Sequence, residues 1–229
     1  SLCQDHHPQL IIFDTDICNE EELYPAIDRI KEMLPESILI LLLDESDTLR
    51  LRTFLRQDPD IIMLGEIRDG DTAQMAVRSS LTGHLLFSTI HTNTAWGAVA
   101  RLSDMGVHPY LVANTLVMTV AQRLVRLLCS HCKREVAATD EVRRLVPDAE
   151  AHFEAVGCER CFYTGYSGRR AVYEVIPMDD ELSTAARNGL SDVAPMLAKR
   201  GIPSLKDAVV GLFLRGETSL DELIPLLNY

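Results

Sequence analysis

The sequence predicts an α/β fold, in which a mainly parallel sheet with helices on both faces precedes a cysteine-rich module and a small helical C-terminal domain. Two observations carry this prediction. Short, almost wholly apolar segments alternate with stretches of helical periodicity, as in parallel strands joined by crossover helices. In addition, four cysteines fall into two C-x-x-C pairs. The predicted boundaries are 1–128 for the core (units 1–48 and 49–128), 129–175 for the cysteine module and 176–229 for the helical domain.

The individual elements follow from apolar runs and their spacing. Strands are predicted where aliphatic runs are bounded by polar residues or proline, at 10–13, 38–43, 61–64 and 85–90, with a short fifth strand near 170–175. Helices are predicted where apolar residues recur every three or four positions, at 20–33, 71–80, 94–104, 110–128 and along the tail from 179 to 229. Right-handed crossovers make the first four strands parallel neighbours, with Asp14 and Glu66 at one carboxyl edge.

The charge distribution limits the possible partners. The chain has 22 basic and 34 acidic residues, a net charge of −12. Residues 1–49 hold twelve acidic and two basic residues, or −10, which leaves −2 for the rest. Because binding to phosphate needs neutralising cations, nucleic acid is not expected as a partner.

Features of targeting and membrane insertion are not found in the printed sequence. The longest aliphatic run, 38–43, has six residues, far fewer than the roughly 20 that cross a bilayer. The start of the sequence lacks the basic and apolar pattern of a signal peptide. We therefore expect neither a membrane span nor export. Because the chain opens on Ser1 rather than Met, we expect it to be a fragment of something longer.

Cysteine spacing predicts a metal centre. Cys129 and Cys132 form one C-x-x-C pair, and Cys158 and Cys161 form another after 25 intervening residues. Two such pairs are typical of a tetrahedral zinc site, whose four protein ligands leave it a structural role. Two disulfides or four unrelated thiols are the alternatives, and a reducing cytosol disfavours the disulfides. His131 could replace one thiolate, but its adjacency to Cys132 makes it a less natural ligand.

Two polar groupings accompany the third and fourth predicted strands. Glu66 ends the run that begins at Ile61, and this places its carboxylate at the edge where open α/β sheets bind ligands. Such a carboxylate can orient a water molecule or hold Mg²⁺ beside a phosphate chain. His84 and His91 bracket the next strand, and Asn93 follows it. Considered separately, Glu66 is better explained as a capping or salt-bridged acid, and both histidines as ordinary core or surface residues.

Several motifs taken together resemble one known family. These are 56–69, 73–76, 80–84, 88–93, 121–125, both cysteine pairs, 164–174 and 216–222. The combination resembles the secretion ATPase superfamily over about residues 49–229, and most closely the type II secretion and type IV pilus assembly ATPases. The four cysteines favour this branch over the retraction motors. The resemblance implies a RecA-like core, with Ile61–Glu66 as the Walker B strand.

The resemblance also implies roles for individual residues. Glu66 corresponds to the catalytic acid, and His84 and His91 to the histidine box, with His91 as the γ-phosphate sensor. Arg68 and Asn93 correspond to residues beside the nucleotide. The implied cofactors are ATP with Mg²⁺ and structural zinc. The implied partners are further subunits in a homo-oligomer or ring and the inner-membrane platform of the apparatus, which makes the protein cytoplasmic and peripheral to the inner membrane.

The N-terminal fifth departs from the family pattern. When Leu23–Tyr24 is aligned with the helix that follows the P-loop, Asn19 occupies the position of the phosphate-binding lysine, and Glu20 that of the Mg²⁺-binding hydroxyl. The expected glycine positions are occupied by Phe13, Asp16 and Cys18. A phosphate nest needs glycine backbone and a cation, whereas acidic residues repel a triphosphate. Residues 1–48 are therefore predicted to be a degenerate P-loop unit, and the chain a nucleotide-poor or inactive paralogue with an assembly or regulatory role.

Other interpretations stay open. The chain is alternatively an active ATPase motor that drives pilin or pseudopilin assembly and secretion, if P-loop geometry survives or a partner subunit supplies the missing groups. Residues 8–46 also resemble the middle of a response-regulator receiver, with Asp14 as phosphoacceptor. A third interpretation is a strand–helix–strand segment without a specific role. Because the family hydrolyses ATP while the P-loop lysine and glycines are not found, the sequence leaves enzymatic activity open.

Overall fold

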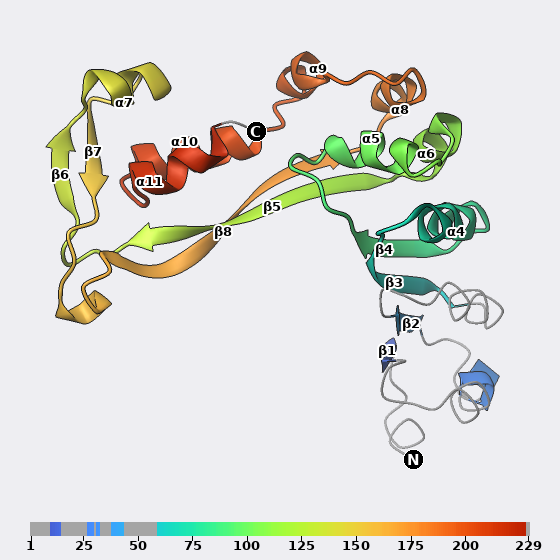
Figure 1. Ribbon diagram of the computed structural model, residues 1–229. Helices are drawn as coiled ribbons and strands as arrows, with labels where there is room; N and C mark the ends of the chain where they lie inside the picture. The colour runs from blue at the N-terminus through green and yellow to red at the C-terminus, as the bar shows by residue number, and fades with distance from the viewer. Residues whose placement is uncertain (1–9, 15–26, 30, 33–37, 44–58, 228–229) are drawn as a thin grey trace. The chain divides into compact units, whose positions relative to one another are not determined.

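The computed structural model (Figure 1) describes residues 10–14, 27–29, 31–32, 38–43 and 59–227. They divide into two compact units. The first unit contains the described residues of Ser1–His91, Ala98–Leu116 and Ser183–Gly189. The second contains Thr92–Gly97, Val117–Leu182 and Leu190 onwards. The chain therefore passes from one unit to the other directly after His91 and returns after Gly97.

A four-stranded parallel sheet forms the centre of the first unit. Its strands are β1 (Leu10–Asp14), β2 (Ile38–Leu43), β3 (Ile61–Glu66) and β4 (Leu85–Thr89), in that spatial order. All three pairings are parallel, which confirms the predicted sheet. Because β2 pairs with β3, the N-terminal strands do not form a separate body. Asp14 and Glu66 end their strands at the same carboxyl edge. The predicted helix 20–33 is described only at 27–29 and 31–32, where the backbone is helical.

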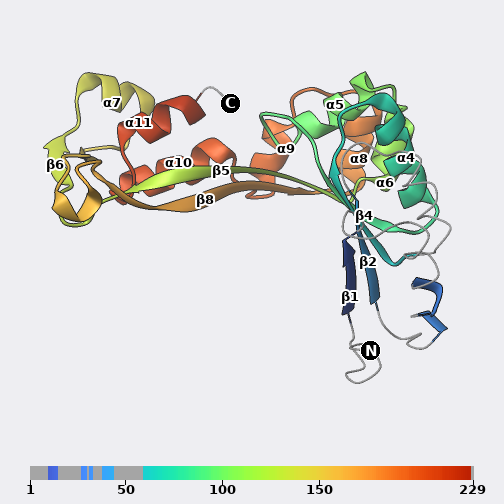
Figure 2. The same ribbon diagram turned by 60° about the horizontal axis from the view of Figure 1, so that its bottom comes forward.

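The two faces of this sheet differ. Ile62 and Leu64, which share one face of β3, are buried, and α4 (Gly70–Leu81) contacts the neighbouring strand β4 (Figure 2). The opposite face carries Met63, Leu85 and Phe87, each about half exposed. Among the described residues helices therefore cover one face, not both as predicted. The strand order explains the difference, because right-handed crossovers between strands in sequential order all pass over the same face.

Helix α4 begins and packs for identifiable reasons. Oδ1 of Asp69 accepts a hydrogen bond of 2.8 Å from the backbone N–H of Thr72, which caps the helix. Gly70 is required by space, because a Cβ there would lie 2.5 Å from the carbonyl oxygen of Met105. That residue directly follows α5 (Gly97–Asp104), and α6 (Pro109–Thr115) contacts α4. The capping residue, Asp69, lies three positions after Glu66 in the chain.

The second unit is built on a long antiparallel ribbon of β5 (Met118–Leu128) and β8 (Tyr166–Pro177). The prediction of a helix over 110–128 was wrong beyond Thr115. Thr119, Ala121 and Val125 are buried while their neighbours Val120 and Leu124 are exposed, which is the alternation of a strand. Pairing with β8, whose partner residues lie 38 or more positions later in the chain, supplies the hydrogen bonds that decide this conformation.

The other elements follow β5 in the chain. They are β6 (Arg134–Ala137), α7 (Asp140–Leu145), β7 (Ala151–Glu154), η1 (Glu159–Cys161), α8 (Asp180–Arg187), α9 (Ala194–Lys199), α10 (Leu205–Leu214), α11 (Leu220–Leu223) and η2 (Ile224–Leu226). Helix α10 lies along the ribbon (Figure 2) and contacts β5, β7 and β8, so a separate C-terminal helical domain is not confirmed. The boundaries at 128 and 175 stay predictions. Within the described residues, no helix has the length and apolarity needed to cross a membrane.

Candidate active site and metal centre

Glu66 occupies the end of β3, where two hydrogen bonds join the backbone around it to Thr89 of β4. The register between β3 and β4 shifts between Leu64 and Glu66, so Glu66 lies beside Thr89. The N–H of Ile67 donates to the carbonyl oxygen of Thr89 at 2.9 Å. The Thr89 hydroxyl donates in turn to the carbonyl oxygen of Gly65 at 2.7 Å. These bonds fix the backbone on both sides of Glu66.

The carboxylate of Glu66 has two side-chain neighbours. Nε of Arg68 donates to Oε2 at 2.9 Å. Nε2 of His91 lies 2.7 Å from Oε1, an ion pair when the imidazole is protonated. That contact does not have hydrogen-bond geometry, so Oε1 is buried without a hydrogen-bond partner among the described residues. Glu66 is 7% exposed, whereas the side chain of His91 is 88% exposed.

This arrangement fits the nucleotide chemistry that the resemblance implies. Burying a carboxylate oxygen without a hydrogen-bond donor costs free energy, and a bound water molecule or cation removes that cost. Carboxylate oxygens are suitable ligands for Mg²⁺ and suitable acceptors for the proton of an attacking water molecule. Glu66 therefore fits one acidic position beside a magnesium nucleotide, with Arg68 holding its second oxygen. Asn19, the predicted P-loop position, lies outside the described residues.

His84 lies at the other end of β4. Its Nδ1 is 3.1 Å from the carbonyl oxygen of Ser79 and 3.1 Å from the hydroxyl of Thr82, at the end of α4. Because a carbonyl can only accept, Nδ1 carries the proton in the neutral ring. The strand between His84 and His91 has five residues, a length of roughly 16 Å at about 3.3 Å per residue. The structure therefore brings His91 and Arg68, but not His84, to Glu66.

Asn93 belongs to the second unit, together with the segment that follows His91. Nη2 of Arg123 lies 3.5 Å from its carbonyl oxygen, at the limit of hydrogen bonding. The hydroxyl of Thr94 accepts from the N–H of Gly97, the first residue of α5, at 3.1 Å. The predicted nucleotide role of Asn93 stays a prediction, since the described contact of this residue uses its backbone.

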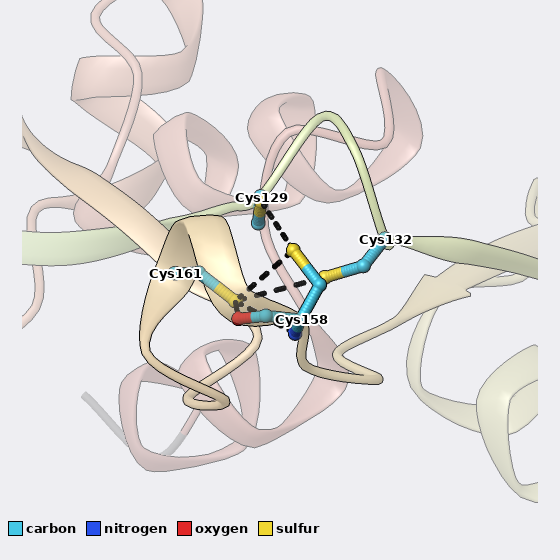
Figure 3. Close-up of side chains that lie close together, drawn as sticks. All are labelled: Cys129, Cys132, Cys158 and Cys161. Carbon is cyan, nitrogen blue, oxygen red and sulfur yellow. Dashed lines mark hydrogen bonds between the residues drawn. The ribbon is translucent and has the colours of Figure 1, made fainter.

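The four cysteines converge (Figure 3). Their sulfur atoms all lie within 4.8 Å of one another. Cys129 and Cys158 are 4.0 Å apart, and Cys132–Cys161 and Cys158–Cys161 are 3.8 Å apart. A tetrahedron with Zn–S bonds of about 2.3 Å has sulfur–sulfur edges of about 3.8 Å. This group can therefore hold a metal ion. The disulfide alternative is wrong here, because all four cysteines are free.

The loop after β7 brings its two cysteines into position through tight backbone geometry. Phe162 and Tyr163 both adopt positive φ angles, 51° and 60°. Gly157 and Gly165 have φ angles of 101° and 79°, and added Cβ atoms would lie 2.7 Å from the carbonyl oxygen of Tyr163 and 2.6 Å from Cβ of Ala155, respectively. Gly165 also accepts the N–H of Cys129 at 2.9 Å, which joins the two cysteine turns.

Backbone donors favour thiolate at this centre. The N–H groups of Cys158 and Gly165 point at Sγ of Cys161, at 3.2 and 3.3 Å. Burial raises the pKa of Cys161, but these donors and the neighbouring thiols of Cys132 and Cys158 outweigh it and lower the pKa to about 6. Burial and the neighbouring thiols raise the pKa of Cys132 to about 12. His131 is exposed, with Nε2 2.8 Å from Arg160, outside the sulfur cluster.

A parallel sheet with a buried acid at the carboxyl end of an inner strand defines an α/β fold of the kind whose ligands bind at that edge. Comparison with known proteins gives the family. Residues 45–224 match the family described as Type II/IV secretion system protein. The chain therefore belongs to that family, as the motifs predicted. Residues 1–44 lie outside the match.

Named relatives agree with this assignment. Type II secretion system protein E of Aeromonas hydrophila is 43% identical over 180 residues, which cover 76% of this chain and 36% of that protein. Type IV pilus assembly ATPase PilB of Thermus thermophilus is 43% identical over 182 residues, 76% of this chain and 20% of that one. The chain thus spans about a third or less of these relatives.

Solved structures agree on the fold. The pilus retraction motor PilT, solved with bound ADP, superposes with a TM-score of 0.58 at 19% identity, over 95% of this chain and 60% of PilT. The Legionella pneumophila ATPase DotB gives 0.55 at 15% identity, over 97% of this chain and 60% of DotB. At such identities the comparison establishes an ATPase-type α/β fold and nothing finer.

Proposed function

We propose that this chain is a subunit of a type II secretion or type IV pilus assembly ATPase, in which Glu66 and His91 form the hydrolytic half of a nucleotide site. The observation that carries the proposal is the 2.7 Å contact between His91 and the buried Glu66 at the end of β3. The similarity to protein E and PilB supports it. In this role the protein works in a cytoplasmic ring beside the inner-membrane platform.

Glu66, Arg68 and His91 have different roles in the proposed site. Bound magnesium ATP would supply the phosphoryl group that is attacked and the charge that the site must neutralise. Oε1 of Glu66, which has no hydrogen-bond donor in the described structure, accepts a proton from water. Arg68 holds Oε2 and so fixes the orientation of the carboxylate. His91 lies on the exposed side of the acid, where it can sense a phosphate.

We further propose that the isolated chain binds MgATP weakly and serves as an assembly or regulatory subunit. The acids at Asp14, Asp16 and 20–22 occupy the positions aligned with the phosphate cradle. A carboxylate about 4 Å from a phosphate oxygen opposes binding by about 1 kcal/mol in water and by about 4 kcal/mol near a protein surface. Several such acids outweigh the attraction of His91. Raised salt should then strengthen binding, because it screens this repulsion.

Calorimetric titration with MgATP, with hydrolysis measured alongside, tests this proposal. We expect weak or no binding and no turnover above that of a Glu66→Gln variant. Binding that appears only at raised salt supports repulsion as the cause. Turnover in the unmodified chain that Glu66→Gln abolishes shows instead that the chain is an active motor, the second candidate. That candidate is favoured by the intact contact of His91 and Arg68 with Glu66.

The four cysteines serve the proposed function indirectly. Four thiolates at tetrahedral spacing leave no open coordination position, so zinc here has a structural role. We propose that zinc holds the turn after β5 and the loop after β7 together. The bound zinc would stabilise the end of the ribbon and would take no part in hydrolysis.

A further inference from the structure

The pairing of β3 with β4 changes register immediately before Glu66. Leu64 pairs with Ser88, whereas the next pair along the ladder joins Glu66 to Thr89. Two residues of β3, Gly65 and Glu66, thus follow in the space of one residue of β4, which is the arrangement of a β-bulge. Bulges often lie next to active sites, where they change the direction of a side chain. The direction of the Glu66 side chain therefore depends on what holds this bulge.

Thr89 holds the bulge through two hydrogen bonds. Its carbonyl oxygen accepts the N–H of Ile67 at 2.9 Å, a bond that any residue at this position can form. Its hydroxyl donates to the carbonyl oxygen of Gly65 at 2.7 Å, a bond that needs a hydroxyl side chain. Gly65 is also the residue type with the greatest backbone freedom. The side-chain bond therefore acts on the peptide that is hardest to fix by other means.

Both peptide planes of Glu66 are held by this one residue. The carbonyl of Gly65 lies in one plane with the nitrogen and Cα of Glu66, and the N–H of Ile67 lies in one plane with its Cα and carbonyl. Each of these groups bonds to Thr89. The two soft dihedral angles of Glu66 lie between these planes, so holding both planes fixes the direction of its side chain.

Thr89 also lies close to His91 along the chain. Two residues span at most about 7 Å, at about 3.6 Å per residue. The His91 side chain is 88% exposed, so packing contributes little to its placement against the buried acid. The backbone that leads out of β4 therefore determines where this side chain lies. Glu66, Thr89 and His91 all belong to the first unit.

We propose that the hydroxyl of Thr89 positions the acid–histidine pair of the candidate active site. By holding the Gly65 carbonyl, it fixes the direction of Glu66 and the start of the chain that leads to His91, and so maintains their 2.7 Å contact. Thr89 acts through these two side chains and is a positioning residue. The catalytic meaning of this inference rests on the proposed function, but the contact itself can be measured without ATP.

The first measurement follows the contact at fixed pH in the full chain. The Cε1–H resonance of His91, assigned with His91→Gln, is recorded with and without Glu66→Gln. In the unmodified protein we expect removal of the Glu66 charge to shift this resonance. In Thr89→Val, which removes the hydroxyl at nearly constant shape, the shift should become severalfold smaller. Thr89→Ser keeps the hydroxyl and should restore it.

A matched control and two contrary outcomes define this measurement. Thr115→Val is the control, because that hydroxyl also donates to a carbonyl oxygen, of Leu111 at 2.8 Å, in α6 of the same unit. It should leave the His91 shift unchanged. A shift of unchanged size in Thr89→Val overturns the positioning role. An equal loss in Thr89→Ser overturns it as well, because the hydroxyl would then not be the cause.

The second measurement distinguishes positioning from general loosening of the sheet. Amide hydrogen exchange reports local opening residue by residue. In Thr89→Val we expect exchange to accelerate severalfold at Ile67, whose N–H bonds to residue 89, and to stay unchanged at Ile62 in the buried part of β3. Equal acceleration at Ile67 and Ile62 shows a purely structural role and contradicts the proposal.

A folding control completes the experiment. If Thr89→Val is not folded by circular dichroism, Thr89→Ala replaces it, with the same expected and contrary results. A nucleotide titration that contradicts the proposed function, together with a Thr89-dependent His91 shift, overturns that function and leaves the positioning role in place. A His91 shift that is independent of the hydroxyl, with the nucleotide result as proposed, overturns the positioning role alone.

Discussion

The cysteine centre and the Glu66 site differ in how much of their geometry is built locally. The four sulfur atoms are held by two tight turns, by backbone N–H groups aimed at sulfur and by two glycines whose replacement would clash. All of these groups belong to the second unit. At the Glu66 site the acid is buried, but its histidine is almost fully exposed and precedes a segment anchored elsewhere.

This difference suggests different responses to perturbation. A centre closed by its own turns should fail only when a ligand or a turn is lost. A site whose histidine is exposed should depend mainly on the backbone contacts of β3 and β4 around its acid. The following predictions test this contrast, in order of decreasing expected effect.

Loss of the metal should have the largest effect. Structural zinc contributes an apparent binding free energy of about 10–16 kcal/mol in small zinc modules. We therefore expect a Cys129→Ser, Cys161→Ser double variant to lose zinc and, by hydrogen exchange, protection around 129–165, while residues 61–90 stay protected. Cys18→Ser, outside both pairs, is the control and should retain zinc. Less than about half an equivalent of zinc in carefully prepared unmodified protein would contradict the assignment.

A glycine pair tests whether the cysteine turns are locally determined. Gly165 and Gly168 have similar φ angles of 79° and 83°, but only at Gly165 would an added Cβ meet a close neighbour. Backbone strain costs about 1–3 kcal/mol, and overpacking adds a similar amount. Gly165→Ala should therefore lower the unfolding free energy by about 3 kcal/mol and Gly168→Ala by about 1 kcal/mol. Denaturant unfolding measures both, and equal losses would show that the turn relaxes.

The smallest effect concerns Asp69, which caps α4 just beyond Glu66. Asp69→Ala should cost about 1 kcal/mol of stability through the lost cap and leave the zinc content unchanged. The backbone N–H of Thr72 lowers the pKa of Asp69 below its ordinary value. The resulting stabilisation is present above the unfolded pKa, near 3.9, and is lost as pH falls through the lower folded pKa.

The pH dependence of this cap has its own control. Asp69→Asn keeps a side-chain oxygen for the cap but does not titrate, so its stability should fall less than that of the unmodified protein between pH 5 and pH 2. Thermal unfolding across this range provides the comparison. Parallel curves for the two proteins would show that the carboxylate charge does not contribute.

Local chemistry made part of this molecule predictable. Near-continuous apolar runs predicted the four parallel strands, because short runs of this kind are typical of parallel sheets. The spacing of Cys129, Cys132, Cys158 and Cys161 predicted their convergence, because each pair lies on one short turn. Glu66 could be placed at the carboxyl edge because it ends a strand whose direction the crossover rule determines.

Other features depended on partners distant in sequence. The segment 118–128 has apolar residues that suit either a helix or a strand, and only pairing with β8 decides between them. His84 and His91 are alike in sequence, but the length of β4 puts them at opposite ends, so only one contacts Glu66. The hydrogen bond of Glu174 could not be recognised from its motif, because the sequence does not show which N–H a buried acid in a strand will contact. In this chain that N–H belongs to Ala95, 79 residues earlier, and tertiary packing alone brings the two together.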